Sequence, residues 1–190
     1  MKSTTRSLAV LLATALVLVI APSPSIAQDK GKTAAAELTK ESQAALARLN
    51  ASAPLAKLLG PKAHAVLVFP SVTKAGLGIG GQYGEGALLK AGKATAYYKT
   101  TGASFGLQAG GQKYGYAMFF MNEKALAELD KANGFEVGVG PSVVLVDEGM
   151  AKTTTSTTLK EDIYAFVFGQ KGLMAGLGIQ GNRIARIQPK

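Results

Sequence analysis

The sequence predicts an α+β fold, with a mainly antiparallel β-sheet of about eight or nine strands, N-terminal helices and one inserted helix. Residues 65–190 hold short apolar runs separated by glycine turns, which favours hairpins over βαβ units. Residues 33–50 are rich in Ala, Glu, Lys, Gln and Leu and lack Gly and Pro, which favours a helix. Asn122 can cap an inserted helix over residues 123–132. The pattern leaves open whether the sheet is barrel-like or packs as a sandwich.

Residues 1–27 are predicted to be a signal peptide. Two basic residues precede an uncharged apolar run from Leu8 to Ile20, and Ser25-Ile26-Ala27 places small residues at the two recognition positions of a cleavage site. The apolar run is shorter than the stretch of about 20 residues that spans a membrane. We therefore expect a mature chain that begins at Gln28 and is exported, to the periplasm or to the periphery of the cell envelope.

The composition narrows the classes of partner. The chain has no cysteine, so neither a disulfide nor a lipid attached to a cysteine is expected, and any membrane association would be non-covalent. The signal carries two of the 21 basic residues and none of the 12 acidic ones, which leaves 19 − 12 = +7 on the mature chain. This charge favours acidic partners such as membrane headgroups or anionic polysaccharide. Export argues against nucleic acid as a partner.

A helical segment over residues 28–64 is expected to precede a glycine-rich β domain over residues 65–190. Within the first helix Leu38, Ala45, Leu46 and Leu49 form a narrow apolar stripe. We expect this stripe to pack against the domain rather than to lie on a membrane surface. A short second helix is predicted over Pro54–Leu59, because proline suits the first helical turn and Gly60 follows the end.

The glycine-rich segment 74–86 follows the apolar run Ala65–Phe69, which predicts a strand buried on both faces. At the two-residue period of a strand, Ala75, Leu77 and Ile79 share one face, and the other face is glycine at positions 76, 78, 80, 84 and 86. Glycine weakens a strand, so the presence of five glycines on this face needs a structural reason, such as a bulge or a closely approaching surface. The pattern returns in residues 175–181.

The other predicted elements follow in chain order. They are a turn at 91–93, strands over 95–99 and 103–109, a turn at 110–113, a strand over 114–121, and, after the inserted helix, strands over 135–146, 163–168 and 173–187, with a turn at 147–149 and a Thr/Ser run over 153–158 suited to a solvated strand.

The sequence offers little for catalysis. His64 is the single histidine and precedes a buried run, so a structural, hydrogen-bonded role is expected, and without cysteine no ordinary zinc site can form. The adjacent acidic pairs Asp147-Glu148 and Glu161-Asp162 fall at turns, and we interpret both as solvated. The glycines of 76–81 do not resemble a nucleotide-binding loop, since no helix opens after them. We therefore expect no enzyme activity, no metal and no cofactor.

Four segments together resemble the SYLF domain, a lipid-binding module of bacterial exported proteins and of eukaryotic endocytic proteins. They are residues 65–76, 80–86, 104–110 and 171–176, in family order and spacing, and the resemblance extends over about residues 38–187. It implies a β-rich domain with N-terminal helical elements that binds anionic phospholipid. Lys74 and Lys171 are the basic residues inside the matching motifs, so the resemblance implies that they contact lipid.

The leading hypothesis is a non-catalytic exported protein that binds anionic phospholipid, with phosphatidylglycerol or cardiolipin as the physical equivalents of phosphoinositide. Its predicted lipid-binding residues are Lys74 and Lys171, helped by Lys30, Lys32, Lys40 and Arg48 of the N-terminal segment. The alternative is a structural or protein-interaction module of the cell envelope that does not bind lipid. An integral outer-membrane barrel fits the strand count but agrees less well with the absence of tryptophan.

Overall fold

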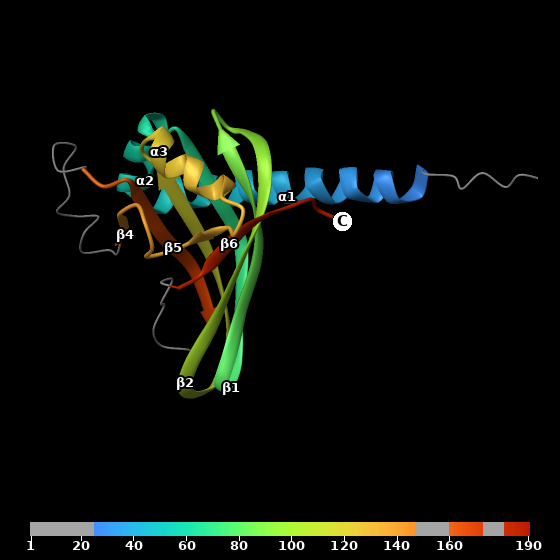
Figure 1. The fold of residues 1–190 in the computed structure, drawn as a ribbon, viewed down its shortest axis with the longest axis vertical. Coiled ribbons are helices and arrows are strands. Elements are labelled where there is room, and N and C mark those ends of the chain that lie inside the picture. The colour runs from blue at the N-terminus through green and yellow to red at the C-terminus, as the bar shows by residue number, and fades with distance from the viewer. Residues whose placement is uncertain (1–24, 147–159, 173–180) are drawn as a thin grey trace, which may run out of the picture.

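The computed structural model describes residues 25–146, 160–172 and 181–190 and shows one curled sheet with helices against it (Figure 1). The helices are α1 (Ser25–Ser52), α2 (Pro54–Leu59) and α3 (Glu123–Ala127), with short 3-10 turns η1 (Gly60–Lys62) and η2 (Glu128–Asp130). The strands are β1 (Ala65–Lys90), β2 (Lys93–Phe120), β3 (Phe135–Glu136), β4 (Val143–Val146), β5 (Ile163–Gly172) and β6 (Arg183–Ile187).

The long hairpin of β1 and β2 is the centre of the sheet. On its other edge β2 pairs with β6 over Tyr97–Thr101 and with β5 over Gln112–Phe120. β3 then pairs with β6, and β4 pairs with β5. All of these pairings are antiparallel except that of β4 with β5. The predicted α+β fold is therefore confirmed, and the strands form one curled, barrel-like sheet rather than the two layers of a sandwich.

The hairpin folds back on itself at its glycines, at the bottom of Figure 1. The β1–β2 register shifts between Gly76 and Gly78, and a Cβ at Gly76 would collide with the backbone of Gly80. A Cβ at Gly84 would lie 2.8 Å from the carbonyl oxygen of Ser71, in the first half of the same strand. The close approach expected of the glycine face is thus present, and the approaching surface is β1 itself. We call residues 75–84 and 100–112 the bend.

The predicted turn at residues 110–113 is wrong, because β2 continues through it. Gly111 pairs with Ala75 and Gln112 with Lys74, so these residues belong to the ladder. A glycine-rich segment at which a strand folds back on itself has the same amino-acid composition as a turn. β1 and β2 each include two or more of the strands expected from the sequence, and the parts of the chain that the structure describes hold six strands.

The predicted turn at residues 91–93 is confirmed. Ala91 has a φ of 47° and Gly92 a φ of 78°, the two positive values of a type I′ hairpin turn.

Hydrophobic residues pack on both faces of the sheet. On one face, Ala45 and Leu49 of α1 and Leu55 and Leu59 of α2 join the outward side chains of β1, β2 and β5. On the other face, Ala125 and Leu129 cover the inner side chains, which include a stacked Phe69–Tyr116 pair with ring centroids 5.8 Å apart. The apolar stripe of the first helix therefore packs against the domain, as predicted.

Asn122 caps α3, as predicted, with its Oδ1 accepting the Ala125 backbone N–H at 2.8 Å. The helix is shorter than expected, because η2 replaces its second half. Asp162 is partly exposed, in keeping with its interpretation as a solvated side chain, but it also has protein partners. Its carboxylate accepts hydrogen bonds from Asn122 Nδ2 (2.7 Å) and from the backbone N–H of Ser142 (3.1 Å), and these contacts, Asn122 first, lower the pKa of Asp162.

Four sequence predictions lie wholly or mainly outside the described residues. They are the signal peptide, the turn at residues 147–149 with its acidic pair, the Thr/Ser run 153–158 and the glycine repeat 175–181.

Candidate functional site

A hollow of about 800 Å³ lies between the N-terminal half of α1, the start of β2 and the residues that follow β6. Lys30, Lys32, Arg186 and Lys190 supply four basic side chains to its wall, and no Asp or Glu is among the described residues that line it. The rest of the wall is largely apolar, with Ala35, Ala96, Tyr97, Ile187 and Pro189. We call this site the basic hollow. It combines basic side chains with an apolar wall, the two features that an amphipathic anion requires.

Contacts along α1 fix the helix against the hairpin and so form one wall of the hollow. Thr39 Oγ1 lies 2.8 Å from the Tyr97 hydroxyl, and Gln43 Nε2 donates to the Gly92 carbonyl at 2.8 Å. A Cβ at Gly31 would lie 3.3 Å from the Pro189 carbonyl oxygen, so the residues after β6 pass close to the helix there. Figure 1 shows that α1 continues past the sheet and that the C-terminus lies below it.

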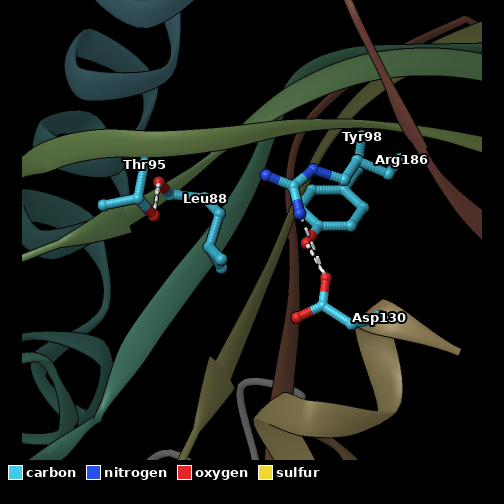
Figure 2. A network of polar contacts seen from close by, with 5 residues as sticks. All are labelled: Leu88, Thr95, Tyr98, Asp130 and Arg186. Atoms are coloured by element: carbon cyan, nitrogen blue, oxygen red, sulfur yellow. Dashed lines mark hydrogen bonds and ion pairs between the residues drawn. The ribbon is translucent and has the colours of Figure 1, made fainter.

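Arg186 stands at the border of the basic hollow. Its Nη1 lies 3.5 Å from Asp130 Oδ1, and the Tyr98 hydroxyl donates to the same oxygen at 3.3 Å (Figure 2). Burial, followed by the charge of Asp130, raises the pKa of Tyr98 to about 12. Asp130 therefore holds the guanidinium in place and offsets part of its charge. Within residues 25–146, 160–172 and 181–190 no ion pair is found for Lys30, Lys32 or Lys190.

A second hollow, of about 350 Å³, shares Thr95, Ala96 and Arg186 with the first. Its wall also contains Glu123 and Asp130 beside Lys90. Because the charges there are mixed, this hollow is less suited to an anion than the basic hollow.

The structure separates the six residues predicted to bind lipid. Lys30 and Lys32 line the basic hollow, whereas Lys40 and Arg48 are exposed further along α1. At about 100° per residue, Lys40 lies on the side of the helix opposite the buried stripe. Lys74 pairs with Gln112, and Lys171 pairs with Lys113, so these two lysines occupy adjacent rows of the sheet with β2 between them. The six residues do not form one patch.

Three basic residues of interest were not selected from the sequence. Arg186 and Lys190 belong to the basic hollow, and Lys113 pairs with Lys171. The sequence predicted a turn at Lys113, and its neighbour on β5 depends on the register of the sheet. Arg186 and Lys190 meet Lys30 only because α1 packs across the hairpin.

His64 does not form part of either hollow. Its side chain is half exposed, with Nδ1 3.9 Å from Glu123 Oε1, and its backbone N–H donates to the Phe120 carbonyl at 2.8 Å. Its backbone therefore anchors the start of β1 to the end of β2.

Comparison with protein families gives a match over the second half of the chain. Residues 101–188 match the Ysc84 family, described as Las17-binding protein actin regulator. The predicted resemblance to the SYLF (Ysc84) domain is therefore confirmed over residues 101–188. The matched part of the SYLF domain runs from β2 to β6 and includes Lys113, Lys171 and Arg186. No curated protein matches the chain.

The family description concerns binding to another protein, so the SYLF domain is a binding module in this general sense. Across the described ranges, none of the helices has the length and apolar character required to cross a membrane. The same ranges hold no cluster of three or more His, Cys, Asp or Glu residues that could bind a metal.

Proposed function

We propose that this SYLF domain binds anionic phospholipid at a membrane surface, as a non-catalytic protein exported to the periplasm or held at the periphery of the cell envelope. The observation that carries the proposal is the basic hollow, in which four basic side chains, with no Asp or Glu side chain among the described lining residues, border an apolar wall. Phosphatidylglycerol and cardiolipin combine a phosphate with acyl chains and fit this chemistry.

The expected strength is that of reversible membrane binding. A basic residue near an anionic surface contributes about 1 kcal/mol, and salt screens this attraction over about 8 to 10 Å. Four residues would therefore supply about 4 kcal/mol at most, less what Asp130 offsets at Arg186. Binding should weaken as salt is raised.

The wall of the hollow also supports the non-catalytic part of the proposal. Its described residues include one threonine and one tyrosine hydroxyl but no His, Asp or Glu side chain that could act as a base beside them. The Tyr97 hydroxyl already shares a hydrogen bond with Thr39 Oγ1.

Vesicle flotation tests the proposal. The protein is purified from a host that exports it, and its N-terminus is determined. It should float with phosphatidylglycerol vesicles at low salt. It should not float with neutral phosphatidylcholine vesicles or at high salt. Processing after Ala27 removes the apolar run that would itself bind vesicles.

A matched pair of charge reversals then locates the site. Lys30→Glu/Lys32→Glu should abolish most of the flotation. Lys57→Glu/Lys62→Glu makes the same charge change on the exposed surface of α2 and η1 and should reduce flotation far less. Equal flotation with neutral and anionic vesicles would contradict the proposal. Absence of flotation together with a stable cross-linked protein complex would favour the protein-interaction module instead.

A further inference from the structure

The bend is free of charged side chains. Between Lys74 and Glu85, and again between Lys99 and Lys113, the sequence holds no Asp, Glu, Lys, Arg or His. These two segments pair with each other in the middle of β1 and β2, where the hairpin folds back on itself. Exposed surfaces usually carry both signs of charge, so a projecting end without any is unusual.

Large apolar side chains are exposed on this end. Ile79 has 72% of its surface exposed, the largest value among the large hydrophobic residues of the described ranges, and Tyr83 has 50%. Both lie at odd positions of β1, on the outward face. Their exposed neighbours on that face, Ala75 and Gly81, are small. Among the described side chains of this face, Ile79 and Tyr83 are the large ones that project, and they are surrounded by small residues.

Basic residues surround the bend where charge resumes. On one arm Lys113 pairs with Thr73 and with Lys171, and Lys74 lies one row closer to the bend. On the other arm Lys99 pairs with Glu85, and Arg183 pairs with Thr101. Glu85 accepts a hydrogen bond from the Tyr83 hydroxyl, and Glu136 pairs with Arg183. Five basic residues thus border the bend against two acidic ones.

We propose that the bend inserts into an anionic lipid bilayer, with Ile79 and Tyr83 among the lipid and the surrounding lysines and Arg183 at the headgroups. This inference rests on the membrane function proposed above and adds a second, separate contact to the basic hollow. The end without charged side chains suits the boundary between the headgroups and the acyl chains, and the basic residues around it suit the anionic headgroups. Figure 1 shows the bend projecting from the body, away from the three helices.

The backbone limits the insertion to the interfacial region. Among the described strands β1 pairs with β2 alone, so within these residues one edge of the hairpin has unpaired amides, which are costly in the hydrocarbon core. The inner side of the bend is also polar, because the Tyr114 hydroxyl donates to Gln82 Oε1 at 2.7 Å and Gln82 donates to Asn182. Only the outward face of the bend is suited to lipid.

A single fluorophore tests the proposal, since the chain has no tryptophan. In Ile79→Trp, the indole emission should shift to shorter wavelength when phosphatidylglycerol vesicles are added, and lipids brominated near the headgroup should quench it. Leu58→Trp places a tryptophan at another exposed apolar position, on α2 and away from the bend, and should show neither change. A thermal melt of each variant establishes that it is folded.

A second variant measures the contribution to affinity. Ile79→Asp should lower the vesicle partition coefficient by about tenfold or more, because an apolar side chain no longer leaves water. Leu58→Asp should change it much less. If the protein floats but the Ile79→Trp emission does not shift, the insertion is wrong and the basic hollow stands. If the protein does not float at all, the membrane function itself is wrong.

Discussion

Asn122 joins three elements through one side-chain amide. Its oxygen caps α3 and its nitrogen donates to Asp162, whose second oxygen accepts the Ser142 N–H just before β4. Asn122→Ala should therefore lower the free energy of unfolding by about 1 to 2 kcal/mol, through the lost cap and the lost carboxylate partner. Urea denaturation measures the change. Asn133→Ala, at an exposed turn, is the control and should shift it by less than about 0.5 kcal/mol.

The same junction predicts a pH dependence. The pKa of Asp162 is lowered in the folded state, chiefly by Asn122, so its carboxylate stabilises the fold above the unfolded pKa of about 3.9. That stabilisation is lost as the pH falls through the folded pKa. The difference in unfolding free energy between the native chain and Asp162→Asn should be constant from neutral pH to about pH 5 and shrink below about pH 4. A difference that is flat down to low pH would mean that the carboxylate does not contribute.

At the scale of elements, the fold-back of β1 depends on glycine at particular positions. A Cβ at Gly84 would lie 2.8 Å both from the Ser71 oxygen and from Val72 Cγ2, whereas a Cβ at Gly81 would be 3.7 Å from its nearest neighbour. Gly84→Ala should lower the unfolding free energy by about 1 to 3 kcal/mol through overpacking. Gly81→Ala, in the same strand, should be neutral or raise it by up to about 1 kcal/mol. Equal effects in a melt would show that the two halves of β1 are not in contact.

The elements also show where the sequence was sufficient. The stripe of Leu38, Ala45 and Leu49 repeats at helical spacing, and the Asn122 cap and the turn at Ala91 are local signals, so each could be read directly. The structure at Gly110 and Gly111 could not be read in this way, because glycine is required both in a turn and where a strand folds back against itself. The choice between them is made by contacts between residues distant in sequence.

At the scale of the whole molecule, the fold class followed from the pattern of runs and turns, but the basic hollow did not. Two of its lysines were selected because they lie in the N-terminal segment, while Arg186 and Lys190 lie more than 150 residues further along the chain. Net charge predicts an acidic partner without showing which cations meet. Their meeting depends on how α1 crosses the hairpin, which is a property of the packed structure.

The pairing of β2 also indicates the order in which the chain folds. β1 and β2 are joined by a tight turn, so their pairing can extend from local contacts. β5 and β6 must close long loops before Ile163 pairs with Phe120 and Ile187 pairs with Tyr97. Because β6 carries Arg186, we expect the basic hollow to be completed only after the hairpin has formed.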